Sequence, residues 1–126
     1  YAAIDRDDDD HHACVELLAT HIGPLVVPTL VIAEVAYFIQ MRLDARSEVG
    51  LLGDLSAGTL IPEPVAAADW LRIAELVWRY QDLQLGTTDA SVVAAAERLG
   101  ATEIATLDRR DFTVVQPVHG PFTLLP

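Results

Sequence analysis

The chain has 126 residues, with 19 acidic side chains against 8 basic ones and a formal net charge of −11. Hydrophobic residues make up 52% of the sequence, which excludes a disordered or fibrous chain and predicts a single domain over residues 1–126. The basic residues are all arginines, so Schiff-base and P-loop lysine chemistry is excluded.

The single cysteine, Cys14, excludes an internal disulfide and fits a reducing compartment. The longest apolar stretch, residues 24–39, is too short to span a bilayer and contains Glu34. We therefore expect a cytoplasmic protein that does not act at a membrane. The net negative charge argues against simple electrostatic binding of nucleic acid, so a nucleic-acid enzyme of this composition would need a metal ion, a local arginine patch or both.

Hydrophobic spacing and turn residues predict alternating helices and short strands. Helices are expected over residues 9–21, 29–43 with Thr29 as N-cap, 45–56 ended by Gly58, 67–81, and from an N-cap at Thr87 or Thr88 to a stop at Gly100. Strands are expected at residues 25–27, 59–62, 104–107, 114–115 and 122–125, with a turn at 108–112. This alternation predicts an α/β fold of three layers, α/β/α, with a mostly parallel central sheet.

The helix over residues 67–81 has an apolar stripe that contains Trp70, Ile73, Val77 and Trp78. We interpret this stripe as part of the core, with a groove for a partner as the alternative.

Ligands of parallel α/β sheets bind beyond the carboxyl ends of the strands, so acidic residues near those ends are candidates for a site. Glu34 is surrounded by apolar residues on a helix that is apolar on all sides, which predicts that its carboxylate is buried beside a cation. That cation is a metal ion or an arginine. The alternative is a glutamate that faces solvent through a gap.

Asp89 lies in the first turn of the helix that follows Thr87 and Thr88, and Asp108 follows the strand at residues 104–107. Each has an ordinary structural explanation, a favourable helix-dipole interaction for Asp89 and an Asx-turn for Asp108. With Glu34, however, they can converge at one edge of a parallel sheet. Converging carboxylates repel one another unless a cation binds, and oxygen ligands without cysteine or histidine favour Mg²⁺ or Mn²⁺. Such a site suits phosphodiester hydrolysis.

Three segments carry a resemblance to a known family. They are Pro28-Thr29-Leu30-Val31-Ile32-Ala33-Glu34-Val35, Leu85-Gly86-Thr87-Thr88-Asp89-Ala90-Ser91-Val92-Val93-Ala94, and Ile104-Ala105-Thr106-Leu107-Asp108-Arg109-Arg110-Asp111-Phe112. In order and spacing they resemble the PIN domain, and in particular the VapC toxins of VapBC toxin–antitoxin pairs.

The resemblance implies an endoribonuclease dependent on Mg²⁺ or Mn²⁺, in which Glu34, Asp89 and Asp108 are the catalytic, metal-binding acids. It further implies that Asp111 is an auxiliary acid and that Thr106 supports the water or the metal. It also implies a homodimer and inhibition by a VapB-like antitoxin. Contacts with RNA are expected from local arginines, for which the candidates are Arg109, Arg110, Arg42 and Arg46.

One departure concerns the first acid of the family, which follows a first strand in an Asp-Thr-Ser-like motif. This chain begins at Tyr1-Ala2-Ala3-Ile4-Asp5, which resembles the segment after that motif. We therefore expect the first strand and first acid to be absent from the PIN domain over residues 1–126 but to lie upstream of Tyr1 in the natural protein. A chain that truly starts at Tyr1 is expected to show little or no nuclease activity.

Three other functions fit parts of the pattern. A catalytically silent PIN-like binding module, acting through its protein partner, would fit a chain that lacks an acid. A DNA-directed metal nuclease would use the same carboxylates. A phospho-acceptor signalling domain also clusters acids at strand ends, but it needs a lysine that this chain lacks.

Overall fold

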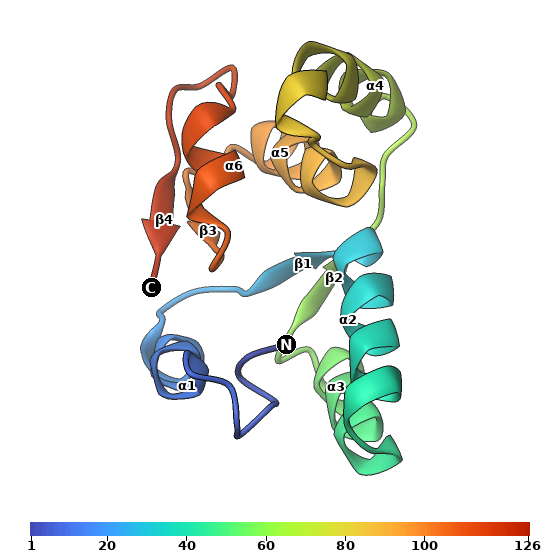
Figure 1. The fold of residues 1–126 in the computed structure, drawn as a ribbon, viewed down its shortest axis with the longest axis vertical. Coiled ribbons are helices and arrows are strands. Elements are labelled where there is room, and N and C mark those ends of the chain that lie inside the picture. Colours follow the sequence, from blue (N-terminus) through green and yellow to red (C-terminus); the bar gives the residue numbers. More distant parts are fainter. The chain divides into compact units, whose positions relative to one another are not determined.

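Helices alternate with short parallel strands along the chain, as the sequence predicts (Figure 1). The structure is a computed structural model that describes residues 1–126, and it consists of two units, Tyr1–Glu63 and Pro64–Pro126. None of its helices has the length and apolar character needed to cross a membrane.

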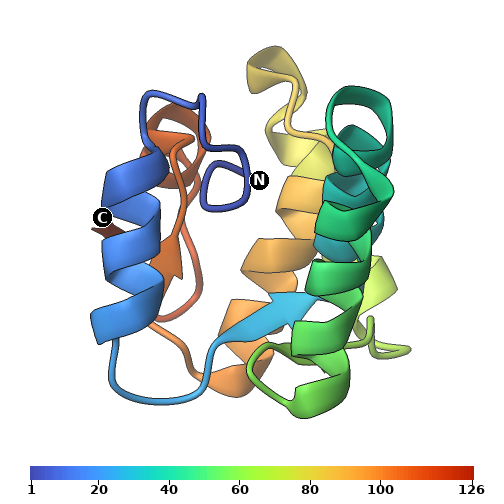
Figure 2. The ribbon, with the colours of Figure 1, turned by 90° about the horizontal axis from the view of Figure 1, so that it is seen from below.

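The first unit contains three helices and two strands. They are α1 (His11–Thr20), β1 (Val26–Pro28), α2 (Thr29–Arg42), α3 (Ala45–Ala57) and β2 (Ile61–Glu63). Strands β1 and β2 pair in parallel, with Val26 opposite Ile61 and Pro28 opposite Glu63. Helices α2 and α3 lie side by side (Figure 2).

The ends of α3 follow the predicted chemistry. The Asp44 carboxylate accepts hydrogen bonds from the backbone N–H of Ser47 at 2.9 Å and from its hydroxyl at 2.8 Å. Gly58 ends the helix with φ of 78°, a left-handed conformation that favours glycine. The prediction that Thr29 is an N-cap is wrong, because the chain passes from β1 directly into α2. Thr29 is therefore already the first helical residue and Pro28 takes the cap position.

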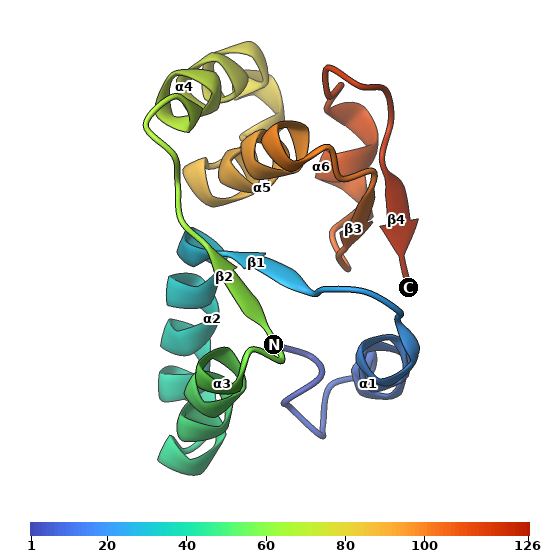
Figure 3. The same cartoon turned by 180° about the vertical axis from the view of Figure 1, so that it is seen from behind.

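The second unit contains four helical segments and two strands (Figure 3). They are α4 (Asp69–Arg79), the 3₁₀ turn η1 (Gln81–Leu83), α5 (Thr87–Leu99), β3 (Glu103–Ala105), α6 (Arg109–Val114) and β4 (Thr123–Leu125). Strands β3 and β4 pair in parallel, with Ile104 opposite Leu124.

Helix α5 contributes more residues to the core of the second unit than any other element. Its alanine-rich sequence lets neighbouring elements approach closely, and Ala90 and Val93 are fully buried. Side chains from the other elements complete this core: Ile73 and Leu76 from α4, Ile104 from β3, and Phe112 and Val115 from α6 and its C-cap. The core thus fixes α4, β3 and α6 around α5.

Two sequence predictions in this unit are wrong. In the stripe predicted for α4, Ile73 is buried and Val77 packs against the core, but the side chains of Trp70 and Trp78 are 51% and 75% exposed. Residues 109–114 form a helix rather than a turn followed by a strand. The Asx-turn expected at Asp108 continues into that helix, since Phe112 three residues into it is buried.

Candidate functional site

Three carboxylates gather in the second unit. Asp89, Asp108 and Asp111 each offer an oxygen atom, and these atoms lie within 4.8 Å of one another. Asp89 lies in the first turn of α5, Asp108 follows β3, and Asp111 lies in the first turn of α6. Two helix starts and the end of a strand thus place three acids together.

The position of Asp89 follows from how α5 begins. Gly86, rather than the predicted Thr87 or Thr88, takes the N-cap position in an extended conformation. Asp89 therefore falls in the first turn, where the helix dipole favours a negative charge. The next residues, Ala90 and Ser91, are buried, and the Ser91 hydroxyl donates a 2.6 Å hydrogen bond to the Thr88 carbonyl. Asp89 is therefore attached to the most buried helix of the unit.

Asp108 is the N-cap of α6. Its Oδ1 accepts a hydrogen bond from the backbone N–H of Asp111 at 3.2 Å, and its own N–H donates to the Thr106 hydroxyl at 3.0 Å. Thr106 therefore fixes the backbone at the acid, which is compatible with the supporting role that the family resemblance implies for it. The predicted Asx-turn and the predicted metal ligand are the same residue, and the two interpretations do not exclude each other.

Asp111 has a pKa above the ordinary aspartate value. Desolvation is the largest cause, followed by the negative charge of Asp108, while Arg110 lowers the pKa and an interaction with the Asp108 side chain raises it further. The Arg110 Nε atom lies 4.0 Å from Asp111 Oδ1, but its side chain is 73% exposed, so its compensation is weak. Asp111 is thus a carboxyl group that gains from a nearby cation.

The donor set fits a hard divalent cation. Two carboxylate charges about 5 Å apart repel by about 3 kcal/mol at an effective dielectric constant of about 20, and a divalent cation removes that repulsion. The cluster contains only carboxylate oxygens, which are the ligands that Mg²⁺ and Mn²⁺ prefer. The cluster could therefore hold Mg²⁺ or Mn²⁺ through Asp89, Asp108 and Asp111.

Glu34 differs from its prediction. It lies on α2 in the first unit and is exposed, so the prediction that it is buried is wrong. The apolar sequence around it suggested burial on all sides, but α2 buries only Ile39 completely. The role of Glu34 as a metal ligand stays a prediction.

The arginines proposed to contact RNA have different surroundings. In the second unit, the Arg109 Nη2 group donates a hydrogen bond to the Pro126 carbonyl, whereas Arg110 extends largely into solvent. In the first unit, the Arg42 guanidinium lies 4.9 Å from the centre of the Phe38 ring. Arg46 is exposed on α3. Arg110 is thus the most available cation next to the acidic cluster.

Asp111 belongs to the cluster more fully than the sequence predicts. The family resemblance implies only an auxiliary role for Asp111, yet its carboxylate oxygen lies within 4.8 Å of those of both Asp89 and Asp108. The signal was its spacing of three residues from Asp108, which places an N-cap and a first-turn residue together when a helix follows. The sequence predicts a turn rather than a helix at residues 108–112, and without a helix this spacing does not indicate that the two side chains lie together.

Comparisons with known proteins agree on the family. The PIN domain family matches residues 1–116. The chain is 34% identical over 126 residues to Ribonuclease VapC26 of Mycobacterium tuberculosis (strain ATCC 25618 / H37Rv), covering 99% of this chain and 93% of that protein. Its fold resembles the crystal structure of Mycobacterium tuberculosis VapC20, a sarcin-ricin loop cleaving toxin, with a TM-score of 0.75. That match has 19% sequence identity and covers 81% of this chain and 78% of the other.

The extent of the family match, the identity to a VapC ribonuclease over nearly the whole length, and the fold all confirm the resemblance found in the sequence. The alternating helices and parallel strands are those of a PIN-like α/β fold. The chain belongs to the PIN-domain family, as a relative of the VapC ribonucleases.

Proposed function

We propose that this protein is a metal-dependent endoribonuclease toxin that hydrolyses RNA phosphodiester bonds. The observation that carries the proposal is the cluster of Asp89, Asp108 and Asp111, in a chain that is 34% identical to a VapC ribonuclease. An acidic protein needs a cation to approach a phosphate, and the cluster is where this chain could bind one.

The proposed site would hold Mg²⁺ or Mn²⁺ through Asp89, Asp108 and Asp111, with Glu34 as a further candidate ligand. A bound ion of this kind activates a water molecule and stabilises negative charge on the scissile phosphate. Thr106 holds the backbone N–H of Asp108, which keeps that carboxylate at the start of α6. The Asp108 carboxylate in turn fixes the first turn of α6, on which Asp111 lies.

Binding of RNA is proposed to rely on arginines close to the acids. Arg110 is exposed directly beside Asp111, so its guanidinium can bind a phosphate oxygen while the acids bind the metal. Arg109, Arg42 and Arg46 stay candidates for contacts further along the RNA.

We also propose that a VapB-like antitoxin inhibits the protein and that the protein forms a homodimer in the cytoplasm. The relative named VapC supports the antitoxin proposal. The chemistry of the cluster supports it as well, because an arginine from a partner could take the place of the metal charge among Asp89, Asp108 and Asp111.

The test is cleavage of labelled total RNA with Mg²⁺, with Mn²⁺ and with EDTA, by a protein that carries any residues preceding Tyr1 in the natural protein. Asp89→Asn keeps the shape of the side chain and removes its charge, so we expect discrete metal-dependent fragments from the unaltered protein and none from the variant. Asp82→Asn is the matched control, because Asp82 is an exposed aspartate of η1 outside the cluster. Metal binding without cleavage of any RNA would support the silent binding module instead, and equal cleavage by Asp89→Asn would overturn the site.

A further inference from the structure

Helix α6 carries two of the three clustered acids on a very short element. Asp108 caps it, Asp111 lies in its first turn, and it has only 6 residues. A helix of this length is not stable alone, so surrounding contacts determine where it lies. The buried side chains of Phe112 and Val115 attach it to the core. Apolar packing is not directional, and polar contacts are needed to fix the position along the helix axis.

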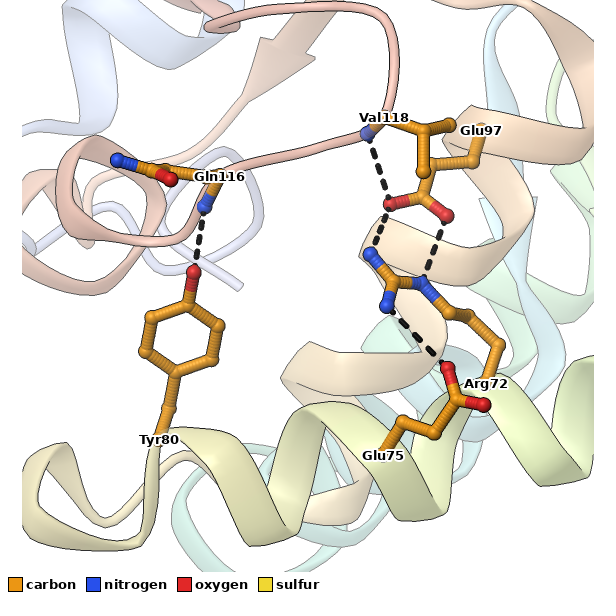
Figure 4. Close-up of polar contacts among 6 residues, drawn as sticks. All are labelled: Arg72, Glu75, Tyr80, Glu97, Gln116 and Val118. Atoms are coloured by element: carbon orange, nitrogen blue, oxygen red, sulfur yellow. Dashed lines mark hydrogen bonds and ion pairs between the residues drawn. The ribbon is translucent and has the colours of Figure 1, made fainter.

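The chain leaving α6 is held by Tyr80. The backbone N–H of Gln116 donates a 2.9 Å hydrogen bond to the Tyr80 hydroxyl, which comes from the C-cap of α4 (Figure 4). Gln116 is only two residues beyond the end of α6. A side chain of α4 therefore fixes the backbone next to the C-terminal end of that helix.

A second contact follows two residues later. The backbone N–H of Val118 donates a 3.3 Å hydrogen bond to Oε1 of Glu97. Arg72 holds this carboxylate through two hydrogen bonds of 2.9 Å, from Nε to Oε2 and from Nη2 to Oε1 (Figure 4). The Glu97 side chain is only 9% exposed, so this carboxylate is largely shielded from water, while the Arg72 side chain is 25% exposed. Pro117, between the two anchored residues, is buried.

Glu97 and Asp89 lie on the same helix, α5. The contact at Val118 therefore attaches the chain after α6 to the helix that carries the third acid. The contacts from Tyr80 and Glu97 act beyond the C-terminal end of α6, while the Asp108 cap acts at its N-terminal end.

We propose that Tyr80 and the Arg72–Glu97 pair are positioning residues for the metal site. By holding Gln116 and Val118 they fix α6 relative to α5, and so keep Asp108 and Asp111 at the correct distance from Asp89. This inference rests on the proposed metal-dependent function of the cluster. The family resemblance implies no role for Tyr80 or for Glu97.

The first test variant is Tyr80→Phe, which removes one hydroxyl and keeps the ring. The second is Glu97→Gln, which removes the charge that holds Arg72. Tyr37→Phe is the control for the first, since Tyr37 is 57% exposed and makes only a ring contact with Phe38. Glu75→Gln is the control for the second, because Glu75 contacts Arg72 at 3.4 Å from an exposed position and does not hold the loop.

The main readout is the Kd for Mn²⁺, measured on the full-length protein by electron paramagnetic resonance well below the unfolding temperature. We expect Kd to rise roughly tenfold in Tyr80→Phe and Glu97→Gln, as is typical when support for metal ligands is removed. Excess Mn²⁺ should restore kcat for RNA cleavage. Hydrogen exchange at the amides of Gln116 and Val118 should accelerate, and both control variants should match the unaltered protein.

An unchanged Kd in folded Tyr80→Phe would overturn the positioning role, even if the variant melted at a lower temperature. That result would leave the proposed function intact, since the unaltered protein would still bind Mn²⁺. If Glu97→Gln does not fold, Tyr80→Phe decides the question alone. Absence of Mn²⁺ binding by the unaltered protein would overturn both the positioning role and the metal-dependent function.

Discussion

Asp108 caps the helix on which Asp111 lies, with Oδ1 accepting the backbone N–H of Asp111 at 3.2 Å. One carboxylate oxygen thus stabilises the local fold, while the side chain also belongs to the acidic cluster. A helix cap and a metal ligand require different properties of the Asp108 side chain. The cap needs only a hydrogen-bond acceptor, whereas the metal site needs negative charge. Substitutions can therefore separate the two roles.

Asp108→Asn should keep the cap and lose the charge. We expect its free energy of unfolding to stay close to that of the unaltered protein, while binding of Mn²⁺ is lost. Asp108→Ala should lose both and should be less stable by about 1 kcal/mol, the usual cost of removing an N-cap. Urea unfolding and Mn²⁺ titration of the two variants measure these effects. Strong Mn²⁺ binding by Asp108→Asn would remove Asp108 from the metal site.

Metal binding should depend on pH through Asp111. Its pKa lies above the ordinary value, chiefly because of desolvation and next because of the charge of Asp108. In the metal-free protein, the stability associated with protonated Asp111 is present at low pH and is lost as pH rises through its pKa. A metal competes with that proton, so the affinity for Mn²⁺ should fall as pH decreases toward the acid range.

Asp111→Asn is the control for this pH dependence. Calorimetric titration with Mn²⁺ at several pH values should show a weaker affinity for the variant, with a smaller dependence on pH. If the unaltered protein and the variant show the same slope of log Kd against pH, protons do not compete at Asp111.

The ion pair between Arg98 and Asp69 should stabilise the second unit. Asp69 is only 7% exposed, and its Oδ2 accepts hydrogen bonds from Arg98 Nε at 3.1 Å and from the Ala66 N–H at 2.9 Å. Arg98→Met leaves this carboxylate without the Nε donor. We expect a loss of about 1–2 kcal/mol in urea unfolding, less than for a fully buried pair because Arg98 is partly exposed. Arg110→Met, at an exposed position, should cost almost nothing.

Helix α4 buries Leu76 and leaves Trp78 exposed, so substitutions at the two positions should differ in their effect on stability. Leu76→Ala should destabilise the protein by about 2–4 kcal/mol, because Leu76 is fully buried. Trp78→Ser should change stability by less than about 0.5 kcal/mol, because Trp78 is 75% exposed. Chemical denaturation followed by circular dichroism compares them without relying on tryptophan fluorescence. A large loss for Trp78→Ser would indicate that Trp78 is buried, as the sequence predicts.

The alternation of helices and strands could be predicted from the sequence because the residues that end each helix lie directly beside it in the chain. Gly58 and Gly100 end helices in left-handed conformations, with φ of 78° and 69°, and both positions were predicted. The helix at residues 109–114 was missed because its stability depends on the burial of Phe112 and Val115 against α5. That burial depends on contacts with residues far away in the sequence, so the five or six residues of the helix do not reveal it.

The candidate site was predicted in part for the same reason. Asp89 and Asp108 were identifiable because they lie at the start of a helix and after a strand, and the structure brings them together. The expected burial of Glu34 failed because apolar neighbours in sequence do not show which faces of a helix are covered. The Arg72–Glu97 pair joins residues 25 positions apart and left no sequence signal.

The most direct measurement compares the Mn²⁺ concentration at half-maximal RNA cleavage with the Kd for Mn²⁺, in the unaltered protein and in Asp89→Asn. We expect that the two values coincide in the unaltered protein, that EDTA abolishes cleavage, and that Asp89→Asn loses both binding and cleavage. Cleavage that persists in EDTA, or that is unchanged in Asp89→Asn, would contradict the assignment of the acidic cluster as the site of metal-dependent RNA hydrolysis.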